Sequence, residues 1–227
     1  MKPAASAFVT LVCLLLAASC KDDGYVYPSV VTEFITMQTD ADGVISTLTK
    51  DDGEVLTVLP RDGIDGLTAD TTYRTVSMYL PSEDDGTSVT LYTCSLVTAP
   101  IPVSREHYKD SLYTGTVFED TIYTDPVDIQ SMRRSGEYLD MILLVMMKSE
   151  PHFYNFIHEG ITDNSSGGRT LHLRLFHFQN RDVLAFTKKV YMSVPLWAYA
   201  DSLSKGDSIE FMINTFEEGE TARYFTY

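Results

Sequence analysis

Residues 31–59 read VTEFITMQTDADGVISTLTKDDGEVLTVL, and the alternation in this stretch decides the fold. Apolar and polar residues alternate, as in Ile35-Thr36-Met37. A period of two residues is typical of a half-buried strand. Asp-Gly pairs interrupt the alternation and favour tight hairpin turns, because both residues tolerate positive φ. Such pairs lie at Asp42-Gly43, Asp52-Gly53, Asp62-Gly63, Asp65-Gly66 and Asp85-Gly86.

The pattern predicts a first domain at residues 31–100, preceded by an acidic tether at residues 21–30. Five short strands in a unit of this size are typical of a small OB-like barrel, and a simple meander is the alternative. The strands are expected at residues 31–39, 44–50, 55–59, 73–80 and 88–97.

A second domain is predicted at residues 125–227, after a linker at residues 101–124 that is stiffened at its start by Pro100 and Pro102. About seven strands separated by turns are typical of a β-sandwich, so the fold class is all-β. A short helix is expected only at residues 196–203. The strands are expected at residues 127–131, 138–148, 152–158, 170–178, 183–194, 208–216 and 222–227.

Residues 138–148 depart from the alternation, because both faces of their strand are apolar. Leu139 and Met141 share one face, and Ile142 and Leu144 share the other. One face of each sheet in a two-layer sandwich normally meets water. We therefore predict that the first domain, a loop or another protein covers the outer face.

Residues 1–20 have the pattern of a secretory signal that ends at a cysteine. Lys2 supplies a positive charge, residues 8–16 are apolar, and small residues precede Cys20. The small residues before this cysteine resemble the lipobox of bacterial lipoproteins, which implies acylation of Cys20, with palmitate among the acyl groups. An uncleaved span is the alternative, but the apolar stretch is shorter than the ~20 residues that a membrane helix needs.

Acidic residues follow directly after Cys20 and dominate the whole chain. Lys21, Asp22 and Asp23 resemble an export signal that sends lipoproteins to the outer face of the outer membrane, and an ordinary hydrated linker is the alternative. The formal net charge is -15, and removal of Lys2 with the signal lowers it by one further charge. Such a surface repels nucleic acid and favours cationic partners or simple solubility.

Short motifs recur in a fixed order over nearly the whole chain after Cys20. They are Tyr27-Pro28, Asp52-Gly53, Asp125-Pro126-Val127, Gly136, Tyr138-Leu139, His152, Leu171-His172-Leu173, Tyr191, Ser193-Val194-Pro195-Leu196, Asn214-Thr215 and Tyr224-Phe225-Thr226-Tyr227. Together they resemble the NigD-like lipoprotein family, with departures at Asp140, where Asn is expected, and at Met132-Arg133, where Trp is expected. The resemblance implies an N-terminal OB-like domain, a C-terminal β-sandwich and no established biochemical function.

No motif in the chain indicates catalysis or metal binding. G-x-S-x-G, H-E-x-x-H and C-x-x-C are all missing. His152 and His158 are too far apart along one strand to share an ion, and His172 and His177 point to opposite faces. His177 is expected to be a hydrogen-bonded core residue. We predict a protein that is not an enzyme, with no catalytic residue, metal or cofactor.

A recurrent Asp-Ser/Thr pair followed by a methyl-bearing residue resembles a bacterial O-glycosylation motif. Turn and cap chemistry is the alternative explanation. The candidate acceptors are Thr71, Ser111, Thr121, Ser202 and Ser208.

Tyr73 and Tyr79 share a strand face with Thr75 and Ser77. We interpret that face as exposed, where aromatic rings could stack on a sugar or a peptide.

Together these features predict a non-catalytic outer-membrane lipoprotein that faces the cell exterior and acts as a binding or structural module. Its partners would be the membrane, through acylated Cys20, and an unidentified protein or glycan, but not nucleic acid. A bacteriocin-associated accessory or immunity protein is the first alternative. A surface glycan hydrolase is the second, and it would need two carboxylates about 5 to 10 Å apart in a cleft.

Overall fold

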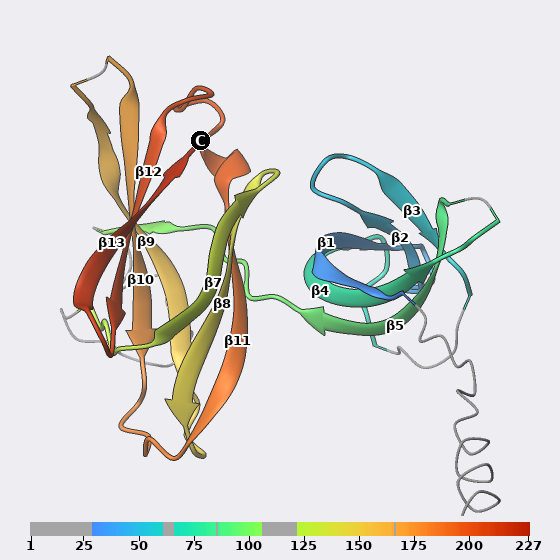
Figure 1. Cartoon of the computed structure of the whole chain (residues 1–227), viewed down its shortest axis with the longest axis horizontal. Coiled ribbons are helices and arrows are strands. Elements are labelled where there is room, and N and C mark those ends of the chain that lie inside the picture. The colour runs from blue at the N-terminus through green and yellow to red at the C-terminus, as the bar shows by residue number, and fades with distance from the viewer. Residues whose placement is uncertain (1–28, 61–65, 85, 106–121, 166) are drawn as a thin grey trace, which may run out of the picture. The chain divides into compact units, whose positions relative to one another are not determined.

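The computed structural model describes residues 29–60, 66–84, 86–105, 122–165 and 167–227, and residues 31–227 form one compact unit (Figure 1). Strands dominate the described residues, and the one helical element among them is the 3₁₀ turn η1, Leu196–Tyr199. No helix among these residues is long and apolar enough to cross a membrane. The all-β prediction is confirmed, as is a short helical element at the start of residues 196–203.

The first five strands close into a barrel with the order β1-β2-β3-β5-β4 (Figure 1). Neighbouring strands are antiparallel except β3 and β5, which are parallel. This is the arrangement expected of an OB-like barrel, so that prediction is confirmed. The strands are β1 (Val31–Thr39), β2 (Ile45–Thr49), β3 (Val55–Val58), β4 (Thr72–Pro81) and β5 (Ser88–Leu96).

The alternation read from residues 31–59 fills the barrel interior. Ile35, Met37, Leu48 and Leu56 are fully or almost fully buried in one cluster. Thr36, between Ile35 and Met37, points away from that cluster, because successive residues of a strand face opposite sides.

The remaining strands form a sandwich of two sheets. One sheet has the order β13-β12-β10-β9-β6 and the other has the order β11-β8-β7. The apolar faces of both sheets meet in a single core that includes Leu143, Leu173 and Phe211. The strands are β6 (Val103–Ser104), β7 (Asp128–Ser135), β8 (Tyr138–Met147), β9 (Phe153–Asp163), β10 (Arg169–Phe178), β11 (Phe186–Pro195), β12 (Ser208–Thr215) and β13 (Gly219–Thr226).

Part of the segment predicted as a linker belongs to the sandwich sheet. Val103 and Ser104 form β6, which pairs in parallel with β9 at Ile157 and His158. A parallel edge strand can form here because Pro102 precedes it and leaves the donors of Val103 and Ser104 in place.

The strand with two apolar faces, β8, lies in the middle of its sheet. Leu139, Met141 and Leu143 are fully buried in the sandwich core. On the opposite face Asp140 is buried, whereas Ile142, Leu144 and Met146 are half-buried. The outer face is therefore covered mainly at the end that contains Asp140.

Candidate functional site

Arg74 lies on the outside of the barrel and is nevertheless only 6% exposed. Residues of β4 alternate, so Thr75, Ser77 and Tyr79 face the interior while Arg74 faces outward. A guanidinium on the surface of a small barrel would ordinarily be solvated. Here the sandwich covers it, and the contact is made through Asp140 of β8.

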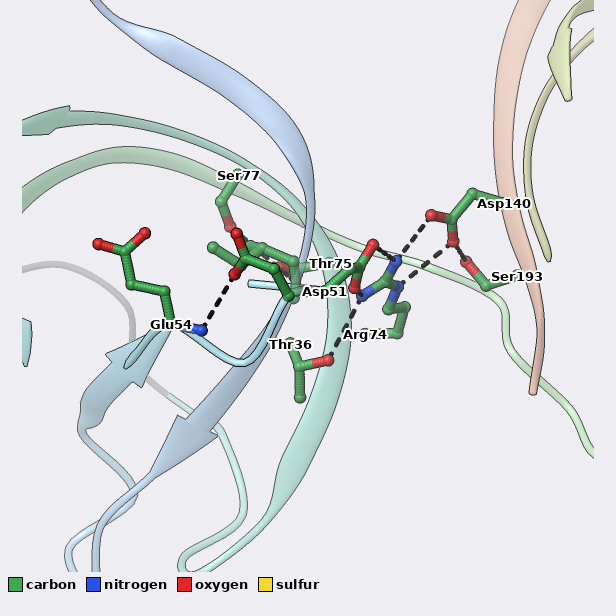
Figure 2. Close-up of polar contacts among 10 residues, drawn as sticks. Thr36, Asp51, Glu54, Arg74, Thr75, Ser77, Asp140 and Ser193 are labelled. Carbon is green, nitrogen blue, oxygen red and sulfur yellow. Dashed lines mark hydrogen bonds and ion pairs between the residues drawn. The ribbon is translucent and has the colours of Figure 1, made fainter. Parts of the chain in front are cut away.

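The Arg74 guanidinium is shared by two carboxylates (Figure 2). Nη1 and Nη2 donate to the two oxygens of Asp51 at 2.6 and 2.9 Å, in bidentate geometry. Nη2 also donates to Oδ2 of Asp140 at 2.7 Å, and the other oxygen of Asp140 accepts from the Ser193 hydroxyl at 2.5 Å. Asp51 comes from the β2–β3 turn, and Asp140 and Ser193 come from paired strands of the sandwich. We call these four residues the Arg74 cluster.

Aromatic rings enclose the same guanidinium. Cζ of Arg74 lies 4.1 Å from the ring centroid of Tyr138 and 5.9 Å from that of Phe34. Phe34 of the barrel also meets Tyr191 of the sandwich edge-on, with ring centroids 6.1 Å apart. Arginine suits this setting, since its guanidinium can stack on an aromatic ring while its N–H groups bind carboxylates in the plane of the guanidinium.

The Arg74 cluster carries one positive and two negative formal charges in a buried place. Burial raises the pKa of Asp140 above its usual range, and the contacts with Arg74 and Ser193 offset that effect only in part. Removal of the guanidinium would leave two acids facing each other in a poorly solvated space, and breaking a buried pair in this way costs about 3–5 kcal/mol.

The β7–β8 turn packs closely against Asp51. Gly136 has φ +54, and a Cβ atom placed there would lie 2.8 Å from both Cβ and the carbonyl oxygen of Asp51. Glycine is therefore required for the approach as well as for the left-handed turn. This contact fixes the position of the carboxylate that binds Arg74.

The segment that leaves β5 continues along the edge of the sandwich. The Thr98 N–H donates to the Tyr191 carbonyl at 3.2 Å, and the Ser193 N–H donates to the Thr98 carbonyl at 3.0 Å. These bonds form a short parallel bridge between Thr98 and β11. The barrel and the sandwich are thus joined by backbone hydrogen bonds beside the Arg74 cluster.

A cleft of about 500 Å³ opens next to the Arg74 cluster. The lining includes Asp51 and the exposed residues Asp52 and Glu137. The Lys50 ammonium is held by Glu54 at 2.6 Å. Hydroxyl and amide groups complete the lining, which consists of Thr36, Gln38, Thr49, Lys50, Asp51, Asp52, Gly53, Thr72, Glu137 and Tyr138.

A second buried polar group lies within the sandwich. Nδ1 of His177 lies 2.8 Å from the Asp125 carbonyl, and Nε2 of His177 lies 3.0 Å from Nδ1 of His152. Nε2 of His152 lies 3.4 Å from Oδ2 of Asp182, which is longer than an ordinary hydrogen bond. We call His152, His177 and Asp182 the histidine chain.

The hydrogen bonds of the histidine chain define the tautomers. A carbonyl only accepts, so His177 carries its proton on Nδ1 and accepts from His152 on Nε2. Burial lowers the pKa of His177 to about 4, which keeps this ring neutral at neutral pH. Asp182 accepts backbone N–H bonds from Lys148 at 2.6 Å and from Val183 at 2.8 Å, and these bonds lower its pKa despite burial.

The prediction of an exposed aromatic face is wrong, because that face is the barrel interior. Tyr79 is 1% exposed and Tyr73 is half-buried against the same cluster. The hydroxyls of Thr75 and Ser77 have hydrogen-bond partners inside the barrel. The Thr75 hydroxyl donates to the Ile35 carbonyl at 3.0 Å and lies 2.9 Å from the Ser77 hydroxyl. The hydroxyl of Tyr79 donates to Glu33. Tyr79 is therefore unavailable for stacking on a ligand, and Tyr73 packs partly into the barrel core.

The other predicted site residues are dispersed. Ser202 is exposed, Ser208 is half-buried in β12, and the Thr71 hydroxyl donates to the Ala69 carbonyl at 2.9 Å. The lipidation, export and remaining glycosylation candidates lie outside the described residues: Cys20, Lys21, Asp22, Asp23, Ser111 and Thr121. Within the described part of the chain, no three His, Cys, Asp or Glu side chains are arranged to hold a metal.

Sequence reasoning placed His177 in the core. It missed the Arg74 cluster, and it missed His152 as the partner of His177. His152 and His177 are 25 positions apart, and the two acids of Arg74 come 23 positions before it and 66 after it. The available signal was a lone arginine on an otherwise uncharged strand and an aspartate, Asp140, within an apolar strand. Both are charges at positions that otherwise predict burial.

The fold and the cleft define the class of protein: an OB-like barrel joined to a β-sandwich, with an acidic cleft beside the joint. The model of the NigD-like C-terminal beta sandwich domain matches residues 111–227, just over half of the chain. The chain therefore belongs to the NigD-like family, as the sequence motifs indicated.

Solved structures of related proteins share this architecture. A NigD-like immunity protein from Bacteroides caccae ATCC 43185 is 29% identical, with a TM-score of 0.69 over 89% of this chain and 99% of that one. A protein of unknown function from Bacteroides vulgatus ATCC 8482 is 20% identical, with a TM-score of 0.65 over 88% of this chain and 91% of that one. The second likeness shows the fold alone. A search of curated proteins found no match.

Proposed function

We propose that this protein is a non-catalytic, lipid-anchored binding protein whose ligand site is the acidic cleft beside the Arg74 cluster. The observation that carries the proposal is the cleft itself, to which the barrel contributes Asp51 and Asp52 and the sandwich contributes Glu137 and Tyr138. A site built from two modules and held by a buried ion pair is pre-organised, which reduces the cost of ordering on binding.

The ligand class follows from the charge of the lining. Asp52 and Glu137 are exposed, while the positive charges nearby are already committed, since Lys50 is paired with Glu54 and Arg74 is paired with Asp51. A cationic segment of a protein or peptide would therefore find two exposed carboxylates in the cleft lining that form no ion pair within the described part of the chain. The overall charge of -15 would steer such a partner toward the protein.

Binding suits the geometry better than hydrolysis of a glycan. Asp51 accepts two hydrogen bonds from Arg74, so it is an oriented acceptor and not a free acid or base. A glycosidase needs one carboxyl that holds a proton and a second that is free to act on the sugar or on water.

Titration with an octalysine peptide tests the cleft. The double variant Asp52→Asn/Glu137→Gln should weaken binding at least ~10-fold, which is about 1.4 kcal/mol. The control Asp84→Asn/Glu217→Gln makes the same change in net charge at two exposed acids that do not line the cleft, and it should cost much less. Equal losses in the two variants would show only long-range attraction and would refute the cleft as the site.

The anchor is proposed at Cys20, on the strength of the small residues before it and the acidic residues after it. Three long acyl chains on one residue would hold the protein almost permanently, and the export signal would place it on the outer face of the outer membrane. Cys20→Ala should release the protein from the membrane fraction. Protease treatment of intact cells should then degrade the wild-type protein if it faces outward.

An immunity role is the second candidate, supported by the name and the 29% identity of the B. caccae protein. An immunity protein would use the cleft to capture a cationic toxin. Expression of the chain in a strain sensitive to a bacteriocin should then protect that strain, and Asp52→Asn/Glu137→Gln should abolish the protection while the level of the protein stays unchanged.

A further inference from the structure

The loop between β10 and β11, together with the first residue of β11, exposes three large apolar side chains within four positions. Val183, Leu184 and Phe186 are 59%, 45% and 47% exposed. Single exposed apolar residues are ordinary, whereas a contiguous group on a small acidic protein indicates an interaction surface. This loop and the β8–β9 turn lie together at the lower end of the sandwich in Figure 1.

Positive charge gathers around the same apolar group. Lys148, Arg181, Lys188 and Lys189 are all exposed, and Lys188 Nζ lies 5.3 Å from the ring centroid of Phe186. The acids nearby are Glu150, Asp182, whose oxygens accept backbone N–H groups, and Asp128, two strands away across the sheet from Lys189. The sign of the charge here is opposite to that of the whole chain, which has 17 basic and 32 acidic residues.

The loop is held in shape by contacts below its surface. Asp182 accepts N–H bonds from Lys148 and Ser149 of the β8–β9 turn and from Val183, and its side chain is 1% exposed. Asn180 and Arg181 have φ 53 and 59, a left-handed conformation that non-glycine residues adopt at a cost. The left-handed turn and the hydrogen bonds of Asp182 together define the course of the chain directly before Val183 and Leu184.

We propose that these residues form a membrane-docking tip, which inserts Val183, Leu184 and Phe186 among the headgroups of an anionic phospholipid bilayer. Apolar side chains surrounded by lysine and arginine are the chemistry of interfacial binding: the apolar groups enter the headgroup–acyl boundary and the cations pair with phosphates. An apolar protein partner would not require the cations, and the tip, unlike the acidic cleft, complements an anionic surface.

The tip is distinct from the acidic cleft and from the anchor at Cys20. The cleft lies beside the Tyr138 end of β8, whereas the tip lies beside the Met147 end of the same strand. Failure of the docking experiment would therefore leave the proposed ligand site untouched, and failure of octalysine binding would leave the tip untouched.

A tryptophan placed in the tip reports docking directly. The chain has one tryptophan, Trp197, so Phe186→Trp/Trp197→Phe moves the only reporter to the tip. The wild-type chain is the matched control, because residue 186 begins β11 and residue 197 follows its far end, roughly 30 Å away at ~3.3 Å per residue. Both chains keep the same N-terminal segment, so any attachment through that segment is common to them.

Vesicles of phosphatidylglycerol should shift the emission of the tip tryptophan to the blue, and brominated acyl chains should quench it at least twofold more than Trp197. Vesicles of phosphatidylcholine should give little response. Equal responses of the two tryptophans, no response of the tip reporter to phosphatidylglycerol, or the same response to both lipids would each overturn the proposal. A tip that binds an acidic protein instead of a membrane would give no response to phosphatidylglycerol.

Charge reversal separates local attraction from overall repulsion. Lys188→Glu/Lys189→Glu in the tip-reporter chain should weaken the response to phosphatidylglycerol at least ~10-fold. The control Arg133→Glu/Lys205→Glu makes the same change in net charge at two exposed residues outside the tip, and it should cost less than ~3-fold. Equal losses in the two variants would overturn the docking role of the tip lysines.

Discussion

The Arg74 cluster and the histidine chain both bury ionisable groups, and they handle the charge in opposite ways. Arg74 keeps its charge and pairs it with Asp51 and Asp140, across the joint of barrel and sandwich. His177 gives up its charge and stays neutral within the sandwich, between a carbonyl and His152. A domain interface can therefore bury a charged arginine when acids from both domains converge on it. Within one sheet, a histidine is buried at a lower free-energy cost as a neutral hydrogen-bonded ring.

The largest effect is expected from Arg74→Met, which removes the positive charge and leaves Asp140 fully buried beside the partly exposed Asp51. The free energy of unfolding should fall by about 3–5 kcal/mol. Urea denaturation at neutral pH measures it. A loss below about 1 kcal/mol would mean that water reaches both carboxylates and that the guanidinium is dispensable.

Acid should weaken the protein through His177. The pKa of this ring is about 4 in the folded chain and about 6.5 in the unfolded chain, so the unfolded chain binds a proton first as the pH falls. The contribution is complete above pH about 6.5 and is lost as the pH falls toward 4, by up to ~3 kcal/mol. The groups that face the ring are His152, the Asp125 carbonyl and Tyr154.

His177→Gln is the matched variant for that titration, because an amide can donate and accept but does not titrate. Its free energy of unfolding should vary less between pH 4 and 6.5 than that of the wild-type chain, by about 2–3 kcal/mol over the interval. Parallel curves for the two proteins would assign the acid sensitivity to another group.

A smaller effect separates charge from packing in the Arg74 cluster. In Arg74→Met/Asp140→Leu both fully buried charges are gone, and Asp51 retains a side chain that is 14% exposed and can meet water. The double variant should be more stable than Arg74→Met alone by about 2 kcal/mol, measured in a double-mutant cycle. Simple addition of the two single losses would contradict the coupling.

The smallest effect is expected from Gly136→Ala, which should cost about 1–2 kcal/mol because the new methyl group would press on Asp51. Gly86→Ala is the control, since φ there is +65 but nothing lies within 4 Å of the added atom. Thermal unfolding of both proteins measures the difference. An equal cost would mean that only the left-handed backbone matters and that the approach to Asp51 is loose.

The sequence predicted the strands well because their signal is local. Residues 31–39 were expected as a strand and form β1, since the alternation through Ile35 and Met37 is the burial pattern of a strand with one face in a core. The same logic failed for Tyr79, because Thr75 and Ser77 suggested a wet face. A closed barrel can bury hydroxyls that bond to each other and to a carbonyl, and single-strand reasoning does not see that partner.

The site was out of reach for a different physical reason. Arg74, Asp51 and Asp140 converge only after the barrel has closed and the sandwich has packed against it, so their relation is tertiary. The prediction that came nearest to the site was that another element covers the outer face of β8, since Arg74 covers that face at Asp140. The identity of the covering residue could not follow from the periodicity of one strand.

The bridge at Thr98 has a consequence for misfolding. β11 is the last strand of its sheet, and an open strand edge is a template on which other chains can assemble. The Thr98 backbone occupies part of that edge by bonding to Tyr191 and Ser193. Detachment of the barrel would uncover the edge, so weakening of the interface should promote strand exchange and fibril growth before the sandwich itself melts.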